Sequence, residues 1–320
     1  MNVRSNGSNT VRNFPIPFSI VICTLNNYAG LEQCVASIVS QVVKPIEIIV
    51  VHGEEGGDVI ERLTPLLQES DISLRYIRSI RSLVIQRNAG IDEAQGEVIV
   101  FLDDDVVLEA DYFSALMTVY REKWGDRLGG VQGVIIENAA VKVWTPLELI
   151  NRIFLLSSVT GRGTLLVSAN PAFLGQNKVL EQVEIFSGCM MSFRRDVLLR
   201  YRFDENFREF WAYDDVEISY RISREFDLYQ TPHARLHHHS SSFSYEGYAK
   251  VARMSVVNRF YLFKRYFSRS LWNWCVFAWS NFGEALVNLL QCIKHRNFKP
   301  IKGFLEGWSL VLGKRIPYLQ

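Results

Sequence analysis

The 320-residue sequence has little net charge, few cysteines and no long apolar run that is free of polar residues. Its formal net charge of +1 gives no global electrostatic reason to expect a nucleic-acid partner. The five cysteines are scattered and show no CxxC spacing, so they indicate reduced, mostly buried thiols rather than a disulfide framework or a zinc site. These absences favour a globular protein of the cytoplasm.

Signals for secretion and for a membrane span are also missing. Residues 1–14 are polar and lack the apolar core of a signal peptide, so we expect a flexible lead-in there. The apolar stretch Leu271–Ile293 contains five polar residues, which makes a membrane span unfavourable: Asn273, Asn281, Glu284, Asn288 and Gln291. Region 243–320 is basic and aromatic. We expect it to be helical, and either to pack on the core or to make a peripheral contact with the inner face of the cell membrane.

Strand and helix patterns alternate through the first hundred residues. Short β-branched runs predict buried strands, at Phe18–Cys23, Ile46–Val51, Ser73–Ile77 and Val98–Leu102. Between them, the patterns predict helices at Leu31–Gln41, at Asp58–Leu67 with an interruption at Pro65, and at Leu83–Ala94. This alternation predicts an α/β fold with a doubly wound, mostly parallel, Rossmann-like sheet.

The second half of the chain has a more mixed pattern. We expect helices at Asp111–Glu122 and Asp214–Arg224, and strands at Gly129–Ile136, Phe186–Phe193 and Thr231–Ser242. Segment 143–177 has no clear periodicity. It is a candidate for a mobile loop or for an insertion that faces a substrate.

An acidic run, Asp103–Asp105, directly follows the predicted strand Val98–Leu102. Ligands of open α/β sheets bind beyond the carboxyl ends of the strands, which is where this run lies. Adjacent carboxylates repel one another unless a cation neutralises them. If the chain stays extended, Asp103 and Asp105 point the same way and can share one divalent ion, Mg²⁺ or Mn²⁺. The alternative is a solvated acidic turn.

Four segments of the sequence carry a resemblance to a known family, and they follow one another along the chain in this order: FSIVICTLNN, QRNAGIDEAQGEVIVFLDDD, SGCMMSFRRDVL…FDENF…YDDVEISYRI and PHARLHHH. In these segments the chain resembles the family 2 glycosyltransferases, which have a GT-A fold and transfer a sugar from a nucleotide-sugar with inversion. The resemblance implies a catalytic domain at 15–242, with a nucleotide-sugar half at 15–108 and an acceptor half at 109–242. Region 243–320 is then a helical extension.

The resemblance implies a divalent metal site at the acidic run. By that match Asp105 ligates the metal, and Asp103 also approaches the ribose or diphosphate of the donor, with Asp104 beside it on the nucleotide-sugar side. A histidine after the Pro-x-Ala segment is a further metal ligand in the family. His238 is the best match and His237 the second. Imidazole beside carboxylates favours Mn²⁺ over Mg²⁺.

The resemblance also implies a catalytic carboxylate at a helix start. The family usually has a Glu-Asp pair there, whereas this chain has Asp214–Asp215, so Asp215 takes the role of the base. A carboxylate can accept the proton of an attacking hydroxyl, and a second acid nearby raises its pKa toward a useful value. Taken alone, the pair also fits simple capping of a helix N-terminus.

Nucleotide and acceptor contacts complete the predicted site. Thr24, Asn26, Arg87 and Asn88 match positions that line the family's nucleotide pocket. The family's acidic pair after the second strand is replaced here by segment 52–55, His-Gly-Glu-Glu, so UDP, dTDP and GDP donors all stay open. The acceptor candidates are Gly188, Trp211, Glu217 and Arg221. Trp211 fits a core position about as well, and Glu217 and Arg221 are spaced as a structural ion pair.

The predicted function is therefore metal-assisted, inverting transfer of a sugar from a nucleotide-diphosphate sugar to a hydroxyl of a polysaccharide or lipid-linked glycan. A non-catalytic nucleotide-sugar or glycan-binding protein with a degraded GT-A fold is one alternative. A sugar-nucleotide pyrophosphorylase is another, but it would need a glycine-rich phosphate loop and a lysine after the first strand, where this chain has TLNNYAG. The donor sugar, acceptor, linkage and oligomeric state stay open.

Overall fold

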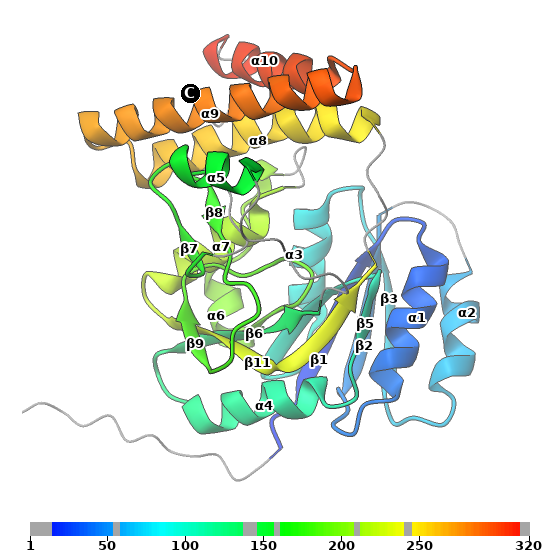
Figure 1. Ribbon diagram of the computed structural model, residues 1–320. Coiled ribbons are helices and arrows are strands. Elements are labelled where there is room, and N and C mark those ends of the chain that lie inside the picture. The colour runs from blue at the N-terminus through cyan, green and yellow to red at the C-terminus, as the bar shows by residue number, and fades with distance from the viewer. Residues whose placement is uncertain are drawn as a thin grey trace, which may run out of the picture.

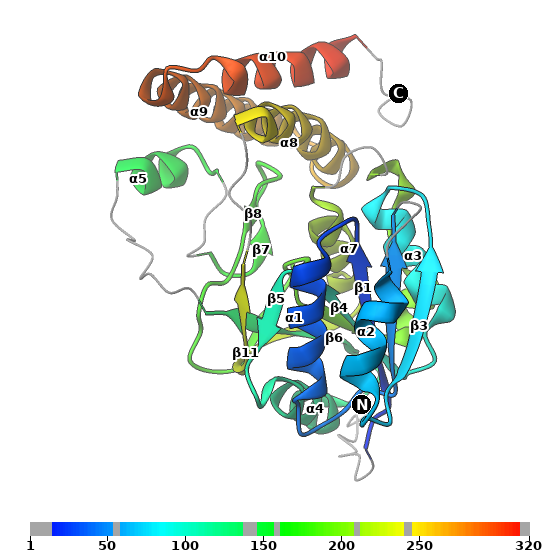
Figure 2. The same ribbon diagram turned by 90° about the vertical axis from the view of Figure 1, so that its right-hand side faces the viewer.

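A mixed sheet with helices on both faces forms the body of the molecule, and three long helices are stacked over one end of it (Figures 1 and 2). The computed structural model describes residues 15–53, 58–136, 146–156, 161–207, 212–239 and 245–313. The expected acceptor candidate Trp211 and the loop acids Glu54 and Glu55 lie outside these residues.

The main sheet has the strand order β3-β2-β1-β4-β10-β6-β11-β5, with β9 paired to β11. The strands are β1 Phe18–Thr24, β2 Glu47–His52, β3 Ser73–Arg78, β4 Val98–Asp103, β5 Val106–Leu108, β6 Leu128–Ile135, β9 Glu181–Val183, β10 Met191–Arg194 and β11 Asp227–His238. The pairs within β3-β2-β1-β4 are parallel, β6 and β11 are also parallel, and β10 lies antiparallel between the two groups. A second, two-stranded sheet consists of β7 Thr164–Leu165 and β8 Pro171–Ala172.

Alternate side chains of the parallel strands enter two different apolar clusters. On β1, Ile20 and Ile22 face the cluster that is covered by α1 Tyr28–Val39, α2 Val59–Leu67 and α4 Tyr112–Lys123. Val21 faces the opposite cluster, which α3 Leu83–Glu93, α6 Arg195–Arg200 and α7 Asp214–Ser223 cover. The strands are therefore buried on both faces, as their continuous β-branched runs predicted. The prediction of an α/β fold with a mostly parallel, doubly wound sheet is confirmed.

Several boundaries differ from the predictions. The acidic run does not stay extended, because Asp104 and Asp105 form a turn between β4 and β5. Of the strand predicted at Phe186–Phe193, only its end belongs to β10, because the chain turns through Gly188 and Cys189. Strand β11 begins and ends four residues earlier than predicted. Helix α2 continues past Pro65.

The C-terminal region forms the helices α8 Tyr245–Tyr266, α9 Leu271–His295 and α10 Lys299–Leu312. Leu262, Phe263 and Phe277 are fully buried and join the apolar cluster of α3 and α7, so α8 and α9 pack on the core. Helix α5 Pro146–Ile153 lies against α9, where the Trp279 indole donates to the Ile153 carbonyl. Within the residues that the structure covers, no helix is both long and apolar enough to cross a membrane.

Candidate active site

The carboxyl ends of β1, β2 and β4 meet at one edge of the sheet. In the parallel register Thr24 pairs with His52, and Cys23 pairs with Asp103. The three strands therefore end at the same level, and the acidic turn that follows β4 lies at that edge. This is where ligands of open α/β sheets bind.

Asp103, Asp105 and His238 form a group that can hold one metal ion. Their ligand atoms all lie within 4.8 Å of one another, although His238 is at the end of β11, far along the chain. His238 Nε2 lies 3.0 Å from Asp105 Oδ1, and this contact lowers the pKa of Asp105 and raises the pKa of His238. Burial raises the pKa of Asp103, so a cation there would stabilise its charged form. Two carboxylates and one imidazole suit Mn²⁺.

The carboxylate of Asp104 accepts hydrogen bonds from other side chains of the protein. Its two carboxylate oxygens accept hydrogen bonds from Thr24 Oγ1, at 2.5 Å, and from Asn27 Nδ2, at 3.0 Å. Asn27 also caps α1, where its side chain accepts from the Gly30 amide. Asp104 and Thr24 therefore join the end of β1 to the acidic turn. Asn26 is exposed in the same loop and accepts from the Tyr28 hydroxyl.

The acid pair at the start of α7 has two different environments. Asp214 is buried and forms an ion pair with Arg87. Asp215 accepts hydrogen bonds from the Gly188 amide, at 2.8 Å, and from the Val216 amide of its own helix, at 2.9 Å. Burial, followed by the charge of Asp214, raises the pKa of Asp215 to about 6. Tyr213, directly before the pair, has a positive φ of 72°, a conformation that is costly for a residue with a side chain.

Arg87 connects the two groups of acids. From α3, its guanidinium contacts Asp214, lies 3.6 Å from Asp103 and donates to the Gly188 carbonyl at 3.2 Å. It also lies over the Phe203 ring, 5.4 Å from the centroid. Burial lowers the pKa of Arg87, but the charges of Asp214 and Asp103 more than compensate, and the net shift is upward. Arg87 is therefore a fixed cation between the metal group and the acid pair.

One cavity of about 550 Å³ reaches both acidic groups. Residues from six separate parts of the chain line it, among them Arg87, Asp103, Gly188, Asp214, Asp215 and His238. A Cβ on Gly188 would lie 3.0 Å from the Arg87 guanidinium and 3.2 Å from Asp215 Oδ2, so the absence of a side chain permits this close arrangement. The cavity can hold a ligand that touches the metal group at one end and Asp215 at the other.

Six of the predicted contact residues do not line this cavity: Thr24, Asn26, Asp104, Asn88, Glu217 and Arg221. The Asn88 carboxamide exchanges two hydrogen bonds with the backbone of Phe203. Glu217 is buried, accepts two hydrogen bonds from Arg221 at 2.9 and 3.0 Å, and accepts another from the Tyr266 hydroxyl of α8. Glu217 and Arg221 thus form the structural ion pair that their spacing allows, and they fasten α7 to α8.

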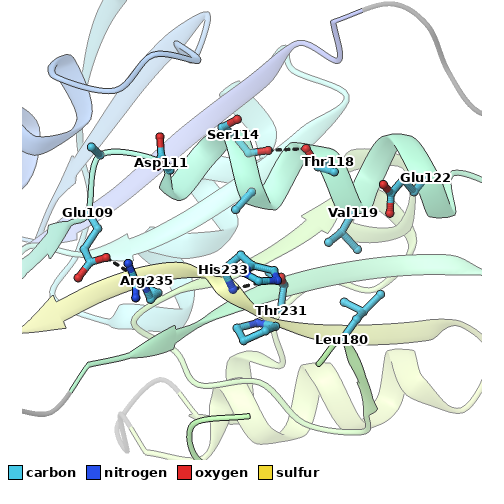
Figure 3. A pocket seen from close by; sticks show the side chains of 13 residues that line it. Glu109, Asp111, Ser114, Thr118, Val119, Glu122, Leu180, Thr231, His233 and Arg235 are labelled. Atoms are coloured by element: carbon cyan, nitrogen blue, oxygen red, sulfur yellow. Dashed lines mark hydrogen bonds and ion pairs between the residues drawn. The ribbon is translucent and has the colours of Figure 1, made fainter. Parts of the chain in front are cut away.

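Sequence reasoning missed Phe173, Cys189 and Tyr213, which also line the cavity. Tyr213 could have been suspected because it directly precedes the acid pair. A larger cavity of about 980 Å³ lies between α4 and β11 (Figure 3). It contains none of the predicted site residues. Its walls carry an ion pair of Arg235 with Glu109 and two further acids, Asp111 and Glu122.

Comparisons with known proteins identify the family of the chain. Residues 19–202, more than half of the chain, match the family model described as Glycosyl transferase family 2. Over 114 residues the chain is 31% identical to the GalNAc(5)-diNAcBac-PP-undecaprenol beta-1,3-glucosyltransferase of Campylobacter jejuni, which covers 35% of this chain and 37% of that protein. Over 188 residues it is 25% identical to the glucosyl-dolichyl phosphate glucuronosyltransferase of Haloferax volcanii, with 57% and 53% covered.

Among solved structures, a mannosyltransferase of Pyrobaculum calidifontis in complex with GDP-Man and Mn²⁺ matches with a TM-score of 0.58 and 14% identity, over 93% of this chain and 87% of that one. That likeness concerns the fold. The chain spans about a third to a half of the length of the two curated relatives. With the family model matched over more than half of its length, the chain belongs to the family 2 glycosyl transferases, and its fold is of the GT-A type.

Proposed function

We propose that this protein transfers a sugar from a nucleotide-diphosphate sugar to a hydroxyl group of an acceptor, with inversion at the anomeric carbon. The observation that carries the proposal is the single cavity that the metal group and Asp215 share. A donor whose diphosphate lies at Asp103, Asp105 and His238 would direct its sugar toward the acid pair. The opposite face of the sugar would then be open to a hydroxyl that Asp215 deprotonates.

Asp215 is suited to the role of base. It reaches the cavity from the first turn of α7, and the amides of Gly188 and Val216 hold its carboxylate in one orientation. With a pKa of about 6 it is mostly ionised at neutral pH, and it is a better proton acceptor than an ordinary aspartate. Arg87 neutralises Asp214 behind it, so the pair carries less total charge into the cavity.

The metal group takes the leaving-group side of the reaction. Asp103, Asp105 and His238 would hold Mn²⁺ or Mg²⁺, which supplies positive charge to a leaving diphosphate. Arg87, 3.6 Å from Asp103, places a fixed positive charge beside the same group. Asp104 and Thr24 would act on the donor through the loop that they hold in place, since their side chains bond each other.

A lipid-linked glycan is the acceptor class that we favour. The two curated relatives described above carry the name of a polyprenyl-linked substrate, undecaprenol in one and dolichyl phosphate in the other. We propose that α9 brings the protein to the surface of the membrane that holds such an acceptor. One face of α9, which Phe154 contacts at Trp279 and Phe282, presents a stripe of exposed apolar side chains: Leu271, Trp272, Trp279, Phe282, Leu289, Leu290 and Ile293.

The stripe has the features of an interfacial helix. Its members recur at helical spacing, and Trp272 is 74% exposed and Ile293 65% exposed. Exposed basic residues lie at both ends of α9: Lys264 and Arg269 before it, Lys294 in its last turn, and Arg296 and Lys302 after it. Apolar side chains flanked by cations suit a bilayer that contains anionic lipids.

A donor panel tests the transferase proposal. The full chain is incubated with UDP-, dTDP- and GDP-sugars and Mn²⁺, and the release of nucleoside diphosphate is measured with and without candidate acceptors. We expect turnover of one donor class, loss of turnover with a chelator, and a product of inverted anomeric configuration by NMR. Binding of a donor without turnover would favour a non-catalytic binding protein, and a retained configuration would exclude the role given to Asp215.

Vesicle sedimentation tests the membrane proposal. The full chain should co-sediment with phosphatidylcholine vesicles that contain about 30% phosphatidylglycerol. Phe282→Glu should abolish this binding, whereas Val42→Glu, at an exposed valine remote from α9, should leave it unchanged. Absence of binding, or a dimer that Phe282→Glu dissociates, would overturn it.

A further inference from the structure

A second cavity, of about 540 Å³, lies among α5, α8, α9 and the segment before α7. Its volume is within the range of small-molecule sites. It shares two lining residues, Ala212 and Tyr213, with the cavity of the acid pair. The segment that leads into Asp214 and Asp215 is therefore a wall common to both cavities.

The lining of the second cavity is rich in carboxamides and poor in net charge. Polar side chains that line it include Asn151, Asn170, Ser255, Glu284, Asn288 and Gln291. The one carboxylate of that set is neutralised, because Glu284 forms an ion pair with the buried Arg259 and accepts a hydrogen bond from Ser255 at 2.9 Å. Carboxamides both donate and accept hydrogen bonds, as sugar hydroxyls do.

A chain of contacts links this cavity to the acid pair. The Tyr213 hydroxyl lies 3.3 Å from Ser255 Oγ, and Ser255 in turn donates to Glu284 on α9. Tyr213 holds its positive φ at the junction, with its side chain tied to α8 and its backbone leading directly into α7. A ligand in the second cavity would thus lie against the residue that precedes the proposed base.

We propose that the second cavity is the subsite for the carbohydrate part of the acceptor. This inference rests on the proposed transferase function and adds where the acceptor sugars bind. Uncharged sugar rings would contact the carboxamides of Asn151, Asn288 and Gln291, and the hydroxyl to be glycosylated would pass Tyr213 to reach Asp215. Asn151 comes from segment 143–177, the candidate substrate-facing insertion, and α9 connects the same cavity to the apolar stripe.

The test uses octyl β-glycosides of glucose, galactose, mannose, N-acetylglucosamine and N-acetylgalactosamine as acceptor probes, with the donor class that the panel identifies. Asn288→Leu and Gln291→Met should each raise the KM for the best probe about tenfold or more, with kcat within about threefold, because they remove binding that ground and transition states share. Donor hydrolysis without a probe should be unchanged. Gln68→Met, at an exposed amide beside α2, is the matched control.

The two proposals fail in different ways. If no donor is turned over, the transferase function itself is wrong, and this inference is wrong with it. If donor hydrolysis occurs but no octyl glycoside serves as acceptor or inhibitor, the second cavity is not a carbohydrate subsite. An unchanged probe KM in both variants, each with a melting temperature like that of the unmodified chain, would overturn the inference in the same way.

Discussion

The acidic run Asp103–Asp105 and the acidic pair Asp214–Asp215 reach one cavity from opposite halves of the chain. Within each group, neighbouring acids have different environments. In the run, the middle residue Asp104 is bonded to Thr24 and Asn27, while its two neighbours face His238. In the pair, Asp214 is neutralised by Arg87 and Asp215 lines the cavity under two amide hydrogen bonds. In both groups one acid is bonded within the protein, and an acid beside it lines the cavity where we propose the chemistry.

The local backbone explains this difference. After β4 the chain turns, so that two acids separated by one residue lie close enough to hold one ion together with His238. On α7 consecutive residues point about 100° apart, so adjacent acids have separate environments. Aspartates of the same group therefore have different surroundings, and we expect their substitution to have different effects on activity and stability.

The largest effect should come from Asp215→Asn. The amide cannot accept the proton of the attacking hydroxyl, so we expect kcat to fall by about 1,000-fold while the KM for the donor changes little. Initial rates of nucleoside diphosphate release give both constants. Asp111→Asn, at an exposed acid before α4, is the control and should keep full activity. Full turnover by Asp215→Asn would show that the base lies elsewhere.

A smaller loss should follow Asp105→Ala. It removes one member of the metal group, and we expect activity at a fixed Mn²⁺ concentration to fall by about 100-fold. The Mn²⁺ concentration for half-maximal rate should rise, and a titration of Mn²⁺ against rate measures it. Equal Mn²⁺ dependence in Asp105→Ala and the unmodified chain would remove Asp105 from the metal site.

The pH profile should distinguish Asp215 from Asp214. The pKa of Asp215 is raised to about 6, so kcat/KM should fall as the pH drops below about 6 and the base becomes protonated. Asp214→Asn removes a negative charge beside it and leaves Arg87 with less compensating negative charge. Both changes favour ionised Asp215, so the acidic limb should move to lower pH. A limb that does not move would mean that another group controls it.

The smallest effect on catalysis should come from Asp104→Asn. An amide can no longer accept from both Thr24 and Asn27, so we expect the free energy of unfolding to fall by about 1–3 kcal/mol. Urea denaturation measures this change. The KM for the donor should stay within about threefold. A much larger increase would show that Asp104 contacts the nucleotide-sugar itself, as the family resemblance first indicated.

Local sequence was sufficient to predict the central strands and the position of the acids at the carboxyl ends of those strands. The runs Phe18–Cys23 and Val98–Leu102 are short and β-branched, which allows little except buried strands. Acids that directly follow such a strand must lie at its carboxyl end. The helix start at Asp214 was also predictable, because the apolar periodicity of α7 begins there.

Contacts between distant parts of the chain were not predictable in this way. The sequence around Asp104 does not predict that Thr24, 80 residues earlier, donates a hydrogen bond to it. Arg87 was expected to line the nucleotide pocket, and its place between Asp103 and Asp214 depends on how α3 and α7 pack. The turn at Gly188 replaces a predicted strand because Arg87 and Asp215 both bond its backbone.

The sequence by itself determined the α/β alternation, the parallel strands and the chemical identity of the acids, because burial and backbone propensity act over a few residues. Only the tertiary structure decided which acids meet the histidine of β11, which one pairs with Arg87 and which ones have a pKa that burial raises. Those outcomes follow from charge, burial and hydrogen bonding over a few ångströms in space, and residues that are close in space here are often a hundred or more positions apart in the chain.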